Sequence, residues 1–522
     1  MDSSRSTDWD FTTITLGAAR GFITESNGTS RTLSLSVLKQ TILGQSSLLL
    51  CHRLNVARRL RIDTFPAFDV LELFAFVHPA VQCIPTPRGL AMALGMRKPG
   101  SDFEEGEILK LATLTLLETL YTSSPIKEPN ILAVAEAMRN GKWEWADKVC
   151  ATLKHHREEE EHRRPRGGLD VWVRLPAWSE HGPEPTSKSH GVDPAEARIR
   201  LSELVGDQAE DRPEQGDYTS AVTPMFAPRE MENLPKTVIA EAGTGVGKTL
   251  GYIAPASIWA EKNSSPVWIS TYTKHLQRQI DAELEKLYPD PELKKRQVVI
   301  RKGRENYLCL LNFEEAVNGI TAKPGTAVSI GLVARWAGVT RDGDIKGGDF
   351  PSWLSDLLGF RNTLGLSDRR GECLFSSCDH YNKCFIEKTV RKSRCADIVV
   401  SNHALLMTQA ALGGIDDSYI PTRLIFDEGH QVFDAADSAF SAEISGRQGA
   451  ELRHWILGTE GPSRRGRGLA RRIQDFAAIE PKIALALAIV EDAATCLPSS
   501  GWQRRMQSGS KPKGPAENFL SF

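Results

Sequence analysis

The pattern of hydrophobic and polar positions divides the chain into two globular regions joined by a polar segment. Short β-prone runs at residues 11–16 and 47–51 predict strands, and residues 107–121 are typical of a helix. Residues 1–150 are therefore expected to form a mixed α/β domain. Residues 151–194 contain a run of charged residues followed by a stretch dense in Pro, Gly, Ser and His, which predicts a linker.

The second globular region is expected over residues 195–446, and it contains every strong motif of the chain. Residues 447–522 follow it and are mostly helical in character, particularly at 450–457 and 469–495. The pattern as a whole predicts an α/β protein with a helical C-terminal segment.

Composition narrows the class of protein. A length of 522 residues predicts about three domains. With 64 Lys and Arg against 66 Asp and Glu, the net charge of −2 gives no overall attraction to nucleic acid, so any anion-binding surface must be local. The first ten residues are polar and no run of about 18 apolar residues occurs, which predicts a cytoplasmic protein without a membrane partner. The nine cysteines are too few for a disulfide scaffold.

The strongest local motif is AEAGTGVGKT at residues 240–249. It follows the β-prone residues 236–240 and precedes a helix-like segment, which is the order of a phosphate-binding loop. Glycines let backbone N–H groups surround phosphate oxygens, Lys248 would contact the β- and γ-phosphates, and the Thr249 hydroxyl would coordinate Mg²⁺. A fortuitous Gly-rich turn is the alternative. The predicted nucleotide-binding residues are Gly243, Thr244, Gly245, Val246, Gly247, Lys248 and Thr249.

A pair of acids follows the apolar run 424–426 in the sequence RLIFDEGH. Asp427 would hold Mg²⁺, and Glu428 would orient and deprotonate the attacking water. In isolation the pair would be as well explained by helix capping, but together with the upstream phosphate loop it indicates catalysis. We therefore expect Lys248, Asp427 and Glu428 to be the catalytic residues.

Four cysteines have the spacing C-x63-C-x4-C-x5-C, at Cys309, Cys373, Cys378 and Cys384. Four thiolates can hold either zinc or a [4Fe–4S] cluster, and the spacing alone does not choose between them. Basic residues cluster on both sides of these cysteines, at 294–304 and 383–394, which predicts a local electropositive surface for a DNA backbone.

These motifs together resemble a known family. The DEGH sequence is similar to the DEAH box of superfamily 2 helicases, with Gly429 where the family usually has Ala, and residues 267–279 resemble motif Ia of DinG-type helicases. The order of phosphate loop, KGRENYLC, clustered cysteines, SNHALL at 401–406 and DEAH-like box resembles the iron–sulfur helicases of the DinG/XPD type over residues 195–522. Gln215, in RPEQ upstream of the phosphate loop, resembles the Q motif.

The resemblance implies an ATP-dependent DNA helicase of the bacterial DinG type that moves 5′ to 3′ along single-stranded DNA. It implies a RecA-like domain over 195–446, an iron–sulfur insertion at about 300–395 and the start of a helical arch over 447–522. ATP, Mg²⁺ and a [4Fe–4S] cluster are the implied cofactors, with forks or R-loops as further substrates. Gln215 would read adenine, and the implied DNA contacts are Thr271, Thr273, Lys302, Arg304 and Tyr307, although Tyr307 might equally pack against the cluster.

The chain also departs from this family. No Ser-Ala-Thr motif follows the DEAH-like box, and residues 463–471 match the late arginine motif poorly. We therefore expect the chain to be the N-terminal part of a longer helicase and to be a monomer. We expect it to bind ATP weakly and to turn over little unless a partner supplies a second RecA-like domain. Two alternatives remain open: a non-catalytic DNA-binding or regulatory fragment, and a zinc-stabilised P-loop ATPase that acts on protein.

Residues 65–76 and 86–94 are similar to the middle of DnaQ-type 3′–5′ exonucleases. Such nucleases bind two metal ions through a D-x-E pair on the first strand, and residues 10–40 contain no such pair. Asp69 and Glu72 could be metal ligands, but they fit a helix with one apolar face equally well. We expect a degenerate, structural exonuclease-like domain rather than an active nuclease.

Overall fold

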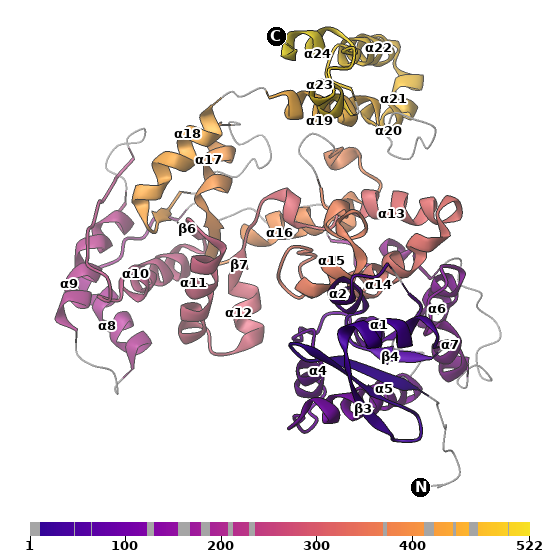
Figure 1. Cartoon of the computed structure of the whole chain (residues 1–522). Helices are drawn as coiled ribbons and strands as arrows, with labels where there is room; N and C mark the ends of the chain where they lie inside the picture. Colours follow the sequence, from indigo (N-terminus) through magenta and orange to yellow (C-terminus); the bar gives the residue numbers. More distant parts are fainter. Residues whose placement is uncertain are drawn as a thin grey trace. The chain divides into compact units, whose positions relative to one another are not determined.

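The structure is a computed structural model of the chain, and it divides into two compact units (Figure 1). The first comprises Met1–Ser179, Arg304–Asp368 and Phe375–Glu387, and the second comprises Glu180–Gly303, Arg369–Leu374 and Lys388–Phe522. The residues that the structure describes are 11–45, 47–63, 65–122, 130–154, 168–178, 188–206, 212–228, 235–368, 373–411, 422–441, 445–458, 468–499 and 501–521.

The first unit is built on a five-stranded mixed sheet with the order β3-β2-β1-β4-β5. Strand β2 is antiparallel to β1 and to β3, whereas β4 and β5 run parallel to β1. Strands form at both positions predicted from the β-prone runs. The strands are β1 (Thr12–Leu16), β2 (Arg20–Thr24), β3 (Ser30–Ser34), β4 (Leu48–Leu50) and β5 (Phe68–Asp69).

Helices cover this sheet and bury its apolar side chains. Ile14, Ile23 and Leu48 from the strands pack with Leu38 and Val56 from α1 and α2 in one core. The predicted helix at 107–121 is the central part of α5. The helices are α1 (Leu35–Leu43), α2 (Arg53–Leu60), α3 (Val70–Val77), α4 (Pro87–Ala93), α5 (Asp102–Thr122), α6 (Ile131–Asn140) and α7 (Ala146–Lys154).

Residues 304–368 and 375–387 also belong to the first unit, and α14 shows how they pack on its helices. Helix α14 contacts α3 and α6, and ten of its eleven residues are buried. Arg335 of α14 donates a hydrogen bond from Nε to the carbonyl of Phe76, at 2.8 Å, and its guanidinium lies over the Phe76 ring. The helices of this segment are α13 (Leu310–Asn318), α14 (Ala327–Ala337), α15 (Ser352–Leu358) and the first part of α16 (Phe385–Ser393).

The second unit contains a four-stranded parallel sheet with the order β7-β8-β6-β9. In its register Trp268 of β6 lies between Val399 of β8 and Leu424 of β9. The elements are α8 (Pro194–Val205), α9 (Pro213–Val222), α10 (Lys248–Asn263), β6 (Val267–Thr271), α11 (Lys274–Leu287), α12 (Pro291–Gln297), β7 (Val298–Ile300), β8 (Ile398–Asn402), α17 (His403–Ala411), β9 (Leu424–Phe426) and α18 (Val432–Phe440).

Helix α10 is the central helix of this unit. It is buried along most of its length, and it packs with α8, α9 and the strands β6 and β8. The β-prone residues 236–240 differ from expectation, because they form no strand and Ile239 is 94% exposed. Strand propensity is realised only where a segment finds a ladder partner, and no described strand pairs with residues 236–240.

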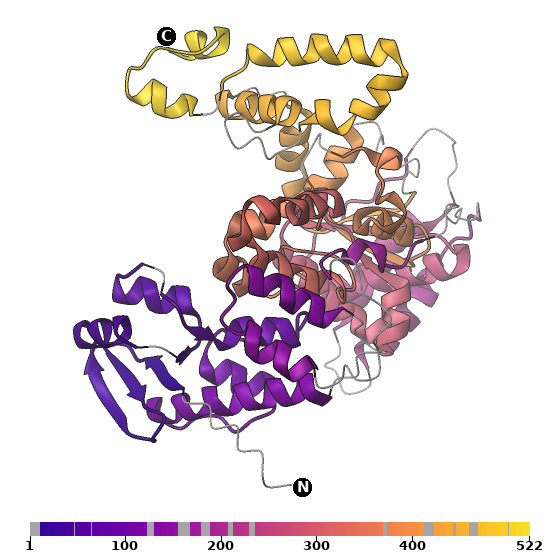
Figure 2. The same ribbon diagram turned by 90° about the vertical axis from the view of Figure 1, so that its right-hand side faces the viewer.

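The C-terminal segment is helical, as predicted. Helix α22 packs against α19 and α21, and α24 also contacts α19 (Figure 2). Glu517 of α24 is buried and accepts hydrogen bonds from Arg505 and Ser499. The helices are α19 (Gly446–Leu457), α20 (Leu469–Arg472), α21 (Gln474–Ile479), α22 (Pro481–Thr495), α23 (Trp502–Gln507) and α24 (Pro515–Leu520).

The structure is thus α/β with one mixed and one parallel sheet, which agrees with the predicted fold class at this level. None of the helices in the described part of the chain is long and apolar enough to span a bilayer.

Candidate nucleotide-binding site

The Gly-rich loop leads directly into α10. Gly245 and Gly247 have φ angles of +88° and +86°, a backbone conformation that glycine adopts without steric cost. Gly247 is the N-cap of α10, so that Lys248 and Thr249 form the first turn of a 16-residue helix. The free N–H groups at such a helix start favour an anion. Among the predicted loop residues, Gly243, Thr244 and Gly245 are exposed, and Val246 and Gly247 are half-buried.

Two side chains at the start of α9, Arg212 and Gln215, hold this loop through hydrogen bonds to its carbonyl groups. Gln215 donates from Nε2 to the Gly247 carbonyl at 2.8 Å, and Arg212 donates to the Gly245 carbonyl at 3.0 Å. A Cβ atom at position 247 would collide with the Gln215 amide, so this glycine is required by packing as well as by its φ angle. The structure therefore places Gln215 against the loop, and reading of adenine by its amide remains a prediction.

The side chain of Lys248 folds back and contacts the backbone of the Gly-rich loop. Its Nζ donates to the carbonyl of Ala242 at 3.2 Å. A phosphate oxygen carries a negative charge and would be a stronger acceptor for this ammonium group than a neutral carbonyl. The lysine is thus held close to the position where the predicted phosphates would lie.

The acidic pair follows β9. The backbone N–H of Asp427 donates to the Ser270 carbonyl at 2.8 Å, which continues the β6–β9 pairing, and Thr271 donates from Oγ1 to Asp427 Oδ2 at 3.3 Å. Burial, followed by the neighbouring charge of Glu428, raises the pKa of Asp427, whereas the Thr271 hydrogen bond and the charge of Lys248 oppose this rise. The pair is therefore anchored by β6 and lies within the electrostatic reach of Lys248.

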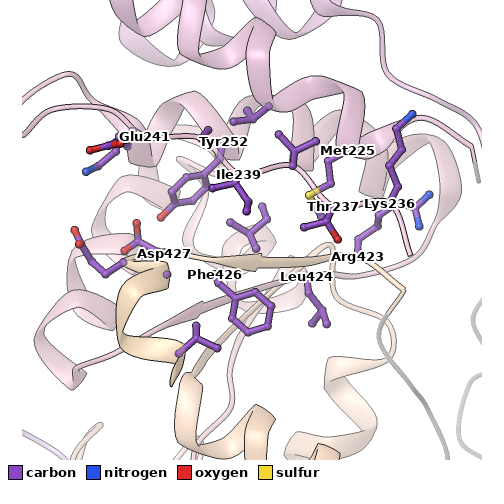
Figure 3. A pocket seen from close by; sticks show the side chains of 18 of the residues that line it. Met225, Lys236, Thr237, Ile239, Glu241, Tyr252, Arg423, Leu424, Phe426 and Asp427 are labelled. Atoms are coloured by element: carbon purple, nitrogen blue, oxygen red, sulfur yellow. The ribbon is translucent and has the colours of Figure 1, made fainter. Parts of the chain in front are cut away.

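Lys248, Asp427 and Glu428 line one pocket of about 1000 Å³ (Figure 3). The pocket is also lined by residues 235–242 before the loop and by 422–430 around β9. Ammonium, hydroxyl and carboxylate groups at the start of a helix are the donors and ligands that Mg²⁺ and a nucleoside triphosphate require. The residues present therefore fit Mg²⁺-ATP, and the structure brings the three predicted catalytic residues together.

The two threonines predicted to contact DNA have other partners in the structure. Thr271 is fully buried, and its hydroxyl is the donor to Asp427. Thr273 is the N-cap of α11 and accepts from the Leu276 N–H at 3.2 Å. Tyr272 between them is 49% exposed. At this turn the accessible side chain is thus Tyr272, which sequence reasoning did not single out.

His403 is a second residue of the site to which the sequence assigned no role. Its ring is fully buried at the start of α17, and Nδ1 lies 2.8 Å from the Ser270 hydroxyl. The ring also packs near Phe426 of β9, with 5.9 Å between centroids. His403 therefore connects β8 to the ends of β6 and β9. The SNHALL sequence marked this position, but the contacts become visible only in three dimensions.

The basic and aromatic residues predicted to bind DNA near the cysteines are largely engaged within the protein. Arg304 forms ion pairs with Asp368 at 3.4 Å and Glu387 at 3.8 Å, and it lies over the Phe375 ring. Tyr307 is only 3% exposed, so stacking on a base would require it to leave its packed position. Lys302 is half-buried.

The four predicted cluster ligands are all half-buried. Cys309 is the N-cap of α13 and belongs to the first unit with Cys378 and Cys384, whereas Cys373 belongs to a segment of the second unit. Among the described residues, no group of three or more His, Cys, Asp or Glu side chains is close enough to hold a metal ion. The cluster site on these four cysteines therefore stays a prediction.

The stretch that carries Cys378 and Cys384 is held by residues 168–178. The Trp178 N–H donates to the Asn382 carbonyl at 2.9 Å, and Lys383 donates to the Trp172 carbonyl at 2.8 Å. Trp178 also meets the Tyr381 ring edge to face at 4.8 Å. Tyr381 is thus packed against a tryptophan of its own unit.

The carboxylates of Asp69 and Glu72 in the first unit accept hydrogen bonds from other groups of the same unit. Asp69 is the N-cap of α3, and its carboxylate accepts from three backbone N–H groups, those of His52, Arg53 and Leu71. Glu72 accepts from Arg53 at 3.3 Å and from the Trp143 indole at 3.0 Å. Burial, followed by the charge of Asp69, raises the pKa of Glu72 to about 7. Both acids therefore have structural roles.

Comparison with known proteins adds independent evidence. No protein-family model matches the chain. It is similar to the ATP-dependent DNA helicase YoaA of Escherichia coli, with 34% identity over 220 residues, which are 41% of this chain and 33% of that protein. Over this stretch the chain is similar to helicases named DinG or YoaA.

Two further proteins of the DinG/YoaA type are similar to the chain to about the same extent. The YoaA helicase of Haemophilus influenzae is 31% identical over 223 residues, covering 41% of this chain and 32% of that protein. The ATP-dependent helicase DinG of Mycobacterium tuberculosis is 32% identical over 232 residues, covering 40% and 33%. The chain spans about a third of the length of these DinG/YoaA relatives.

Proposed function

We propose that the chain provides the nucleotide-binding part of a DinG-type, ATP-dependent DNA helicase and that it binds Mg²⁺-ATP in the pocket of the second unit. The observation that carries this proposal is the convergence of Lys248, Asp427 and Glu428 on one pocket at the start of α10. The similarity to proteins named ATP-dependent DNA helicases supports it.

Each side chain has a distinct role in this proposal. Lys248 contacts the β- and γ-phosphates, Thr249 and Asp427 hold Mg²⁺, and Glu428 orients the attacking water and accepts its proton. Bound Mg²⁺ neutralises charge on the phosphates. Gln215, which now braces the loop, reads the adenine edge.

Fluorescent ATP analogues test nucleotide binding directly. We expect the full chain to bind mant-ATP in the presence of Mg²⁺ and Lys248→Ala to bind it at least tenfold more weakly, because a charged phosphate contact is lost. Equal binding by the two proteins would place the nucleotide elsewhere and overturn the proposal.

The nucleic-acid function is proposed from the resemblance. The substrate would be single-stranded DNA exposed at forks or R-loops, and the protein would move along it 5′ to 3′. The DNA would contact Thr273, Lys302, Arg304 and Tyr307. Thr271 would act indirectly, through its hydrogen bond to Asp427. Backbone binding would make the affinity fall steeply with salt. A salt-independent affinity would instead favour the alternative that the ATPase acts on protein.

A [4Fe–4S] cluster on Cys309, Cys373, Cys378 and Cys384 is likewise proposed, and it rests on the resemblance to iron–sulfur helicases of the DinG/XPD type rather than on the structure. Anaerobic purification with iron, sulfide and zinc analysis tests it. We expect about four irons per chain, lost in Cys378→Ala. Zinc in place of iron would support the zinc-stabilised alternative.

We further propose that this 522-residue polypeptide alone hydrolyses ATP slowly and does not unwind DNA, because residues 431–522 contain neither a Ser-Ala-Thr motif nor a good match to the late arginine motif. Partner arginines would be needed for turnover. Efficient unwinding by the isolated chain would contradict this, and DNA binding without turnover would support a regulatory role.

For residues 1–150 we propose a degenerate exonuclease-like domain without nuclease activity. The likeness of residues 65–76 and 86–94 to such nucleases supports the exonuclease-like part, and the hydrogen bonds that Asp69 and Glu72 accept within the protein argue against metal binding. Degradation of single-stranded DNA in Mn²⁺ or Mg²⁺ that requires either acid would overturn this part of the proposal.

A further inference from the structure

Tyr252 lies one helical turn beyond the phosphate loop on α10. Residues three and four apart on a helix project from the same face, so Tyr252 shares a face with Thr249 and Lys248. These are the two helix residues to which the proposed function assigns Mg²⁺ and phosphate. Tyr252 also lines the same pocket.

The Tyr252 hydroxyl is buried and has no well-formed hydrogen bond. The side chain is 3% exposed, and the polar groups of Thr249 and Asp427 lie near the hydroxyl, but among the described residues none completes a hydrogen bond of normal geometry with it. Removal of a polar group from water without a compensating hydrogen bond is unfavourable for folding. Phenylalanine at this position would fill the same space without that cost, so folding alone does not account for the hydroxyl.

The hydroxyl is directed at the acidic pair. Figure 3 shows the Tyr252 ring pointing its oxygen toward Asp427 at the end of β9. On another side Asp427 already accepts a hydrogen bond from Thr271.

We propose that Tyr252 is a positioning residue whose hydroxyl donates to the Asp427 carboxylate when nucleotide and Mg²⁺ bind. Together with Thr271 it holds the carboxylate in the orientation needed for the hydration shell of the ion. Hydrogen bonds to a metal-binding carboxylate orient it, and their loss typically weakens metal affinity about 10-fold to 100-fold. This inference rests on the proposed function of the same pocket.

The test is Tyr252→Phe in the full chain, with mant-ATP as the probe. We expect the Mg²⁺ concentration for half-maximal nucleotide binding to rise about tenfold. Nucleotide affinity in EDTA should stay unchanged, because the hydroxyl acts through the carboxylate. The melting temperature without ligand should be equal or higher, because an unsatisfied buried hydroxyl is removed.

Tyr288→Phe is the matched control. Tyr288 is also buried in the second unit, but its hydroxyl donates to Asp397 at 2.7 Å. Its loss should lower the melting temperature and leave the Mg²⁺ dependence unchanged. Thr271→Val, which removes the other donor to Asp427, should raise the Mg²⁺ requirement as Tyr252→Phe does.

Three outcomes would overturn the inference. An unchanged Mg²⁺ requirement in Tyr252→Phe would show that the hydroxyl does not act on the ion site. A lower melting temperature or failure to fold would show that the hydroxyl is structural. If the wild-type chain binds no mant-ATP, the proposed function fails and the inference fails with it, which separates that case from the first two.

Discussion

Each unit of the protein has an aspartate directly at or after the end of a parallel strand, with a glutamate close by in the sequence, and the two pairs differ in how they are satisfied. Asp69 and Glu72 accept hydrogen bonds from backbone, guanidinium and indole groups, and both are buried. Asp427 accepts a hydrogen bond from Thr271 and lies in a pocket with Lys248. A carboxylate with its acceptor sites filled supports the fold, whereas one left open to a pocket can bind a ligand.

The largest effect is expected at Asp69. Asp69→Ala would leave three backbone N–H groups without their acceptor, and we expect it to lower the free energy of unfolding by roughly 3–5 kcal/mol. Urea denaturation measures this. Asp63→Ala, which removes an exposed aspartate of the same unit, should change it by less than about 0.5 kcal/mol. A mild effect at Asp69 would break the comparison.

The raised pKa of Glu72 predicts a pH dependence of stability. Its pKa of about 7 in the folded chain lies above the ordinary value of 4.5, so the folded state binds the proton more tightly. Stability from this group is fully present below pH 4.5 and is lost as the pH rises toward 7, by roughly 2–3 kcal/mol. In Glu72→Gln the fall between these pH values should disappear. A rise in stability over the same interval would have the wrong sign.

Asp427→Ala should show the opposite behaviour from Asp69→Ala. We expect the free energy of unfolding to change by no more than about 1 kcal/mol, because one Thr271 hydrogen bond is lost and a buried charge is removed. Mg²⁺-dependent mant-ATP binding should weaken by roughly 2 kcal/mol, about 30-fold. If this variant unfolds as readily as Asp69→Ala, the acid at 427 is structural too.

The smallest effect is expected at Gln215. Gln215→Ala removes one hydrogen bond to the Gly247 carbonyl, and we expect mant-ATP affinity to fall by about 1 kcal/mol, or roughly fivefold. Gln279→Ala, at an exposed position on α11, is the control and should bind as wild type does. Unchanged affinity in Gln215→Ala would show that this amide neither holds the loop for binding nor contacts adenine.

Local motifs in the sequence predicted what lies close along the chain, and failed where the partner is distant. The glycines, Lys248 and the acids after an apolar run indicated the nucleotide pocket, because each role follows from neighbours in sequence. The spacing around Thr271 gave no sign that its hydroxyl faces Asp427, 156 residues further on. Arg304 similarly reads as a free cation, whereas Asp368 and Glu387 pair with it. The missing strand at 236–240 has the same cause, since ladder partners are not encoded locally.

The backbone of Glu428 has one further consequence. Its φ angle of +55° is left-handed, a conformation that disfavours any residue with a side chain by about 1 kcal/mol and suits glycine. Glu428 therefore stores conformational strain at the step from β9 to the next helical turn, and Glu428→Gly would relax it. Glutamate at this position therefore lowers the free energy of unfolding slightly, and its left-handed backbone sets the direction of the carboxylate.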